Sequence, residues 1–81
     1  MSELGVVRKR DPILTAFGQG VRSHRDAKGF SQEALAEKAD LDRTYISDIE
    51  RGTRNPGLKN VVRLAKALGV PAAKLLEGVD A

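Results

Sequence analysis

The regular spacing of helix-start and helix-stop signals is the feature that most constrains how this chain can fold. Asp11 precedes Pro12, which is an N-cap residue followed by a proline at the first helical position. Gly29 then follows the first apolar repeat, where a glycine commonly ends a helix. Similar start and stop residues recur to the end of the chain: Ser31, Asp42, Gly52, Gly69, Pro71 and Gly78. Because no useful length of chain alternates apolar and polar residues, we expect no strands. The pattern predicts an all-α fold, a compact five-helix bundle.

Apolar residues recur at helical spacing between these signals. The predicted helices cover 12–28, 32–39, 43–51 and 58–68, with a short fifth helix between Pro71 and Gly78. Gly18 and Gly20 weaken the first helix, unless they allow another helix to approach closely.

The composition excludes several classes of function. The chain has 81 residues, no cysteine and one histidine, so we expect one small domain without disulfides, without a thiolate or multi-histidine metal site and without cofactors. No nucleophile–base pair or phosphate-binding loop is recognisable, so we expect no catalytic residues. No apolar run approaches the roughly 18 residues of a membrane span, and the first residues do not resemble a signal peptide. A cytoplasmic binding module is the class that remains.

The segment from Gln32 to Arg51 has the pattern of two short helices joined by a tight turn. Ala36 is small enough for the helices to cross closely, and Leu41 fills the corner between them. The inward positions of the second helix are Ile46 and Ile49; the outward ones are Arg43, Thr44, Ser47, Asp48 and Arg51. This is the geometry of a helix-turn-helix, whose second helix enters the DNA major groove.

Three motifs in order extend the match beyond this helix pair: SQEALA at 31–36, YISDIERG at 45–52 and LAKALGV at 64–70. Together they resemble the lambda-repressor-like (Xre-type) helix-turn-helix family of phage repressors and bacterial regulators, over residues 13–77. The stretch LDRTYISDIERGTRNP at 41–56 is similar, more narrowly, to the controller proteins of restriction–modification systems. The resemblance implies a homodimeric transcription regulator that binds a (pseudo)palindromic double-stranded DNA operator.

The resemblance also implies roles for individual residues. Positions that contact bases match Arg43, Thr44, Ser47 and Asp48, and positions that contact phosphates match Gln32, Tyr45, Arg54 and Asn55. An arginine can bind guanine bidentately, and a threonine methyl can touch thymine. Arg25 and Glu50 match a pair that forms a salt bridge between the first and third helices.

Three of these residues have open alternatives. Ser47 contacts either a base or a phosphate. Tyr45 either lies along the DNA backbone or wedges at a flexible base step, or it is partly buried in the core. Asp48 either accepts a hydrogen bond from cytosine or pairs with Arg51 or Arg43, which sharpens specificity by repelling phosphate. Asp40 stands where the family usually has glycine, and aspartate tolerates the left-handed backbone that this turn needs.

The chain carries a net charge of +3, but residues 31–56 hold four basic and six acidic side chains. DNA affinity must therefore come from individually placed groups rather than from a uniformly positive face. We expect residues 1–11 to form a flexible basic arm, with Arg8, Lys9 and Arg10 either reaching DNA or simply solvated.

We expect residues 12–81 to form a single DNA-binding and dimerisation domain. The apolar residues proposed for the dimer surface are Leu68, Val70, Leu75, Leu76 and Val79. Expected partners are the operator DNA, a second copy of the chain and RNA polymerase, with no small-molecule effector. The alternative function is an antitoxin or bridging-type protein-interaction module built on the same bundle.

Overall fold

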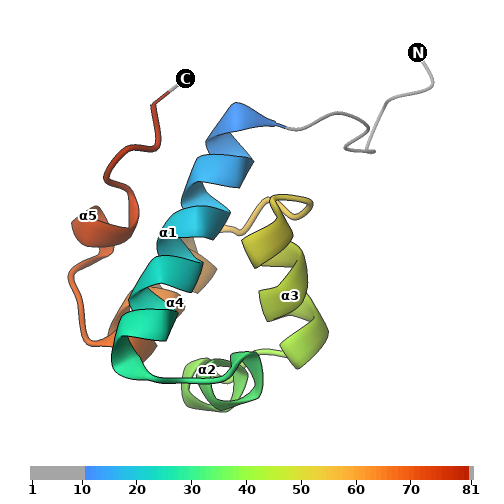
Figure 1. The fold of residues 1–81 in the computed structure, drawn as a ribbon, viewed down its shortest axis with the longest axis vertical. Helices are drawn as coiled ribbons and strands as arrows, with labels where there is room; N and C mark the ends of the chain where they lie inside the picture. Colours follow the sequence, from blue (N-terminus) through green and yellow to red (C-terminus); the bar gives the residue numbers. More distant parts are fainter. Residues whose placement is uncertain (1–10, 81) are drawn as a thin grey trace.

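Five α-helices account for the regular structure of residues 11–80, the part of the chain that the computed structural model describes (Figure 1). They are α1 (Pro12–Lys28), α2 (Gln32–Ala39), α3 (Arg43–Arg51), α4 (Leu58–Leu68) and α5 (Ala72–Leu75). The all-α prediction and the order of its helices are confirmed. The fifth helix is only four residues long, and a turn follows it up to Gly78. Most of the predicted basic arm, including Arg8, Lys9 and Arg10, lies outside the described residues.

Local capping explains most of the helix boundaries. The Asp11 carboxylate accepts hydrogen bonds from the backbone amides of Ile13 and Leu14, and the Ser31 hydroxyl accepts one from Ala34. Such bonds satisfy amides that have no partner inside the helix. Asp42 also stands at an N-cap, but its side chain makes no capping hydrogen bond. The predicted position of this cap is therefore correct, whereas its side-chain hydrogen bond does not form.

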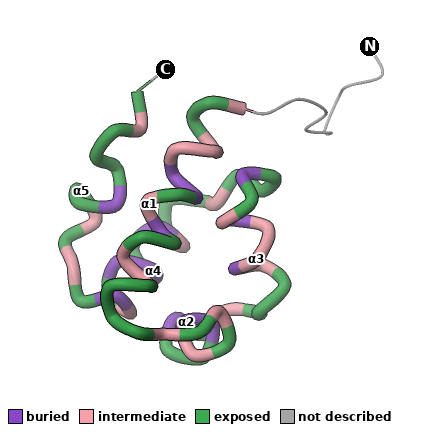
Figure 2. Tube along the Cα trace, viewed as in Figure 1, coloured by how far each residue is buried: buried purple, intermediate pink, exposed green. Residues whose placement is uncertain are grey.

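Every helix contributes to one hydrophobic core (Figure 2). The largest fully buried side chains are Val21 of α1, Leu35 of α2, Ile46 and Ile49 of α3, Leu64 and Leu68 of α4, and Leu75 of α5. The α3 helix packs against α1 and α2, while α4 packs against α2 and α5. In the view of Figure 1, α3 and α5 lie on opposite sides of α1.

The burial of two leucines corrects part of the predicted dimer surface. Leu68 is 0% exposed and Leu75 is 1% exposed within a single chain. Both therefore belong to the protomer's own core, where no partner can reach them. Leu76 is 46% exposed, and Val70 and Val79 are partly buried. These three residues remain available for a surface contact.

A glycine sets the distance between α1 and α3. A Cβ atom on Gly18 would overlap the carbonyl oxygen of Ile49 and lie 2.9 Å from that of Glu50. Of the two roles that the sequence leaves open for this glycine, the structure shows the close helix approach at Gly18. At Gly20 a Cβ would lie 3.5 Å from the carbonyl oxygen of Leu75, which is an ordinary contact. Gly18 therefore brings the last turn of α3 directly against α1.

Candidate nucleic-acid interface

The turn between α2 and α3 holds the two helices in the predicted arrangement. Asp40 adopts the left-handed conformation, with φ of 58°, and the amide of Leu41 donates to the carbonyl of Ala36. On α3, Ile46 and Ile49 are buried against the core. This packing leaves the opposite face of α3 directed away from the bundle.

The predicted base-contacting residues share that outward face. Arg43 and Thr44, at the start of α3, are exposed, and Ser47 and Asp48 are half-buried one turn later. An exposed helix of this kind can enter the major groove of DNA, where its first residues reach the base edges. The structure thus brings the four residues together on one short helix, with two side chains at its tip unobstructed.

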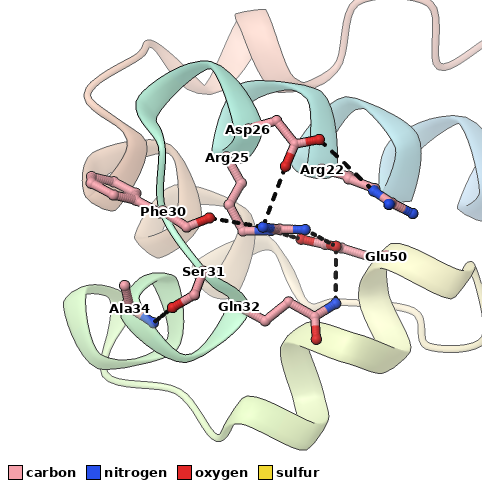
Figure 3. Close-up of polar contacts among 8 residues, drawn as sticks. All are labelled: Arg22, Arg25, Asp26, Phe30, Ser31, Gln32, Ala34 and Glu50. Carbon is pink, nitrogen blue, oxygen red and sulfur yellow. Dashed lines mark hydrogen bonds and ion pairs between the residues drawn. The ribbon is translucent and has the colours of Figure 1, made fainter.

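A buried ion pair holds the other end of α3 (Figure 3). Arg25 donates to the two oxygens of Glu50, with 2.6 Å from Nε to Oε2 and 2.9 Å from Nη2 to Oε1. Its remaining nitrogen, Nη1, donates to the carbonyl of Phe30 at 2.8 Å. The two side chains are only 11% and 4% exposed. Hydrogen bonding to Glu50 raises the pKa of the Arg25 guanidinium above its ordinary value, against the lowering effect of burial.

Gln32 joins the same network. Its Nε2 donates to Oε1 of Glu50 at 3.1 Å, so α1, the start of α2 and the end of α3 meet at one carboxylate (Figure 3). A side-chain amide nitrogen carries two hydrogens. One hydrogen of Gln32 serves Glu50, and the second can be donated to a phosphate at the N-terminus of α2, where the helix dipole favours an anion. The network therefore orients the side chain of Gln32, which is predicted to contact a phosphate, as well as α3.

Asp48 forms ion pairs, which was one of its two predicted alternatives. Its Oδ1 lies 2.5 Å from Nη2 of Arg51, and its Oδ2 lies 3.7 Å from Nη2 of Arg54. Arg51 is one of the two partners that the sequence suggests for Asp48. The sequence does not suggest Arg54, because this residue lies in the loop after α3, where helical spacing gives no guide to side-chain contacts.

Tyr45 is held between α3 and α4. Its ring packs against the hydrophobic core, and its hydroxyl oxygen accepts a hydrogen bond from Nδ2 of Asn60 at 2.8 Å. The guanidinium carbon of Arg54 lies 4.8 Å above the ring centroid, within the range of a cation–π contact. The partial burial considered from the sequence is confirmed. The hydroxyl keeps its own hydrogen, which a phosphate oxygen can accept.

The sequence does not reveal the contact between Asn60 and Tyr45, because the two residues are 15 positions apart and Asn60 is not part of a recognisable motif. Asn55 is exposed in the loop after α3. The predicted phosphate-contacting residues thus come from three places: Gln32 from the start of α2, Tyr45 from α3, and Arg54 and Asn55 from the following loop. Tyr45 and Arg54 are in direct contact.

Within residues 11–80, no group of three or more acidic or histidine side chains is placed to hold a metal ion. Each helix within residues 11–80 is too short or too polar to span a lipid bilayer.

Comparison with known proteins places these features in a family. A sequence profile described as helix-turn-helix matches residues 21–75. Control protein C.BamHI of Bacillus amyloliquefaciens is 58% identical over 66 residues, which cover 80% of this chain and 82% of that protein.

Solved structures of controller proteins share the fold. The restriction-modification controller protein C.AhdI of Aeromonas hydrophila is 48% identical, with a TM-score of 0.76 over 76% of this chain and 94% of that one. C.Esp1396I, bound to a 19 base pair DNA duplex, is 39% identical, with a TM-score of 0.75 over 83% of this chain and 89% of that one.

Proposed function

Because this chain belongs to the helix-turn-helix family of DNA-binding transcription regulators that includes the restriction–modification controller proteins, we propose that it binds a (pseudo)palindromic operator as a homodimer. The family consists of non-enzymatic DNA-binding proteins, so its function is recognition rather than catalysis. The observation that carries the proposal is the outward face of α3, whose exposed tip carries Arg43 and Thr44.

In this proposal α3 reads the base edges of one half-operator. Arg43 binds a guanine through O6 and N7, Thr44 contacts a thymine methyl, and Ser47 and Asp48 border the same groove. The Arg25–Glu50 pair supports this role because it fixes the last turn of α3 to α1.

Phosphate contacts set the orientation of α3 on the duplex. The residues that supply them come from the start of α2, from α3 and from the loop after it: Gln32, Tyr45, Arg54 and Asn55. Such contacts fix the position of a protein on DNA and carry no sequence information themselves. The spare hydrogens of the Gln32 amide and the Tyr45 hydroxyl support this assignment.

Two copies of the chain are required, because one recognition helix reads too few base pairs for useful specificity. The proposed dimer surface consists of Val70, Leu76 and Val79. Leu76 is among the few large apolar side chains that are well exposed in residues 11–80. Since α5 and α3 lie on opposite sides of α1, a contact through this surface leaves the reading face free.

Residues 1–11 supply further basic side chains for DNA, and residues 12–81 form the domain for DNA binding and dimerisation. The protein acts in the bacterial cytoplasm, as a controller of a restriction–modification system, and meets RNA polymerase where its operator adjoins a promoter. The bacterial controller proteins among its relatives support this assignment.

Selection of duplexes from a random pool tests the proposal. The purified protein should enrich a site with two half-sites related by a two-fold axis, about 10 base pairs from centre to centre. Enrichment of a single unpaired half-site would contradict the homodimer. If the bound duplexes have the same base composition as the starting pool, sequence-specific binding is contradicted altogether.

A further inference from the structure

Asp48 is an unusual residue for a DNA-reading helix, because its carboxylate repels phosphate. The side chain is 21% exposed and lies between two arginines that are 65% and 49% exposed. Each carboxylate oxygen serves a different arginine: Oδ1 pairs with Arg51 and Oδ2 with Arg54. Asp48 therefore bridges the last turn of α3 to the loop that follows it.

The backbone of the same residue anchors that loop. The amide of Thr53 donates to the carbonyl of Asp48 at 3.0 Å, and the Thr53 hydroxyl donates to the same oxygen at 3.2 Å. Arg54 then lies over the ring of Tyr45, which is hydrogen-bonded to Asn60. A continuous chain of contacts thus runs from Arg51 through Asp48 to α4, and it determines where the Arg54 guanidinium is held.

A carboxylate that pairs with two arginines affects binding to arbitrary DNA and binding to the matched operator differently. Binding to arbitrary DNA depends on how many cationic groups are free to neutralise phosphates, and each such contact steepens the salt dependence by about one. Binding to a matched operator depends on groups held in the correct geometry. A carboxylate that restrains two arginines therefore weakens binding to arbitrary DNA more than binding to the operator.

From these contacts we infer that Asp48 is a positioning and specificity-determining residue. Its carboxylate holds Arg54 in place for a phosphate of the matched operator and withholds Arg51 from the phosphates of other DNA. The inference rests on the proposed function.

Asp48→Asn is the direct test, because it keeps the shape of the side chain and removes its charge. The two probes are a duplex selected from the random pool by the wild-type protein and a random-sequence duplex of the same length. We expect the variant to bind the random duplex about tenfold more tightly at 0.1 M salt, with a salt slope steeper by about one. Affinity for the selected duplex should rise less or fall, so the ratio of the two affinities decreases.

Asp26→Asn is the matched control. Asp26 also pairs with two arginines, Arg22 at 3.9 Å and Arg25 at 3.4 Å, and its replacement changes the net charge equally. It lies on α1, outside the α3 face. We expect this variant to change both affinities by the same small factor and to leave both salt slopes as they are.

Arg51→Gln gives a second test that does not depend on the folding of Asp48→Asn. If Asp48 withholds Arg51 from random DNA, the salt slope of Arg51→Gln on the random duplex should equal that of the wild type. In the Asp48→Asn background, the same substitution should remove the extra unit of slope.

The outcomes separate the inference from the proposed function. A wild-type protein that selects no duplex contradicts the proposed function, and the role of Asp48 fails with it. If the wild type selects a duplex, but Asp48→Asn keeps its affinity ratio and slopes, only the role of Asp48 is contradicted. The role of Asp48 is also contradicted if the single variant Arg51→Gln lowers the salt slope on random DNA by about one.

Discussion

Arg25 of α1 and Glu50 of α3 form a buried, two-point ion pair, with 2.6 Å between Nε and Oε2 and 2.9 Å between Nη2 and Oε1. Both side chains have further partners, because Arg25 also donates to Phe30 and Glu50 also accepts from Gln32. A satisfied ion pair of this kind can specify how elements are arranged, while its net contribution to stability is small compared with the cost of breaking it. Here it determines how the end of α3 is placed on α1.

Removing one partner of this pair should destabilise the fold strongly. We expect Glu50→Ala to lower the free energy of unfolding by about 3 kcal/mol, because it leaves the buried Arg25 guanidinium without its counter-ion. Urea denaturation measures the change. Lys74→Ala, which removes the exposed Lys74–Glu77 pair, serves as control and should cost less than about 0.5 kcal/mol. Equal losses in the two variants would contradict the role given to the buried pair.

The two glycines of α1 should respond to alanine in opposite directions. Gly18→Ala places a methyl group against the backbone of α3 and should cost about 2–3 kcal/mol. Gly20→Ala meets only an ordinary contact and should be neutral or stabilising by up to about 1 kcal/mol, because alanine favours a helix. Thermal unfolding followed by circular dichroism compares them. A tolerated Gly18→Ala would show that α1 and α3 can separate without cost.

Arg43 and Arg54 should differ in what their loss does to DNA binding. Arg43→Ala should make the free energy of binding to the selected operator less favourable by about 1–3 kcal/mol. It should also relax specificity at one base pair in each half-site. Arg54→Ala should weaken binding to the operator and to each of its single-base variants by the same factor, and should reduce the salt slope by about one. Titrations with single-base variants of the operator distinguish the two. Uniform weakening by Arg43→Ala would remove it from base recognition.

The adjacent residues Leu75 and Leu76 should have separate roles. Leu76→Glu places a charge on the proposed dimer surface and should yield a folded monomer in sedimentation velocity. Leu75 is buried, so Leu75→Ala should lower the unfolding free energy by about 2–3 kcal/mol. A Leu76→Glu variant that sediments as a dimer would place the dimer contact elsewhere.

The helices could be predicted from the sequence because their boundaries depend on local chemistry. Asp11, Ser31 and Asp40 act within a few residues of their own position, as caps or as a left-handed turn residue. The outward position of Arg43 and the burial of Ile46 likewise follow from the helical repeat of α3.

Contacts between distant segments could not be predicted in the same way. Helical periodicity identifies Leu68 and Leu75 as apolar, but it does not distinguish a core within one chain from an interface between two. The partners of Asp48 and Tyr45 depend on where the loop after α3 and the start of α4 lie. These positions follow from packing of the whole bundle.

The affinity for the selected duplex relative to random DNA, measured across a range of salt concentrations, tests the central claim most directly. We expect the selected duplex to bind at least about a thousandfold more tightly, with a steep negative salt slope on both duplexes. Equal affinity for the two duplexes at every salt concentration would contradict base recognition by α3.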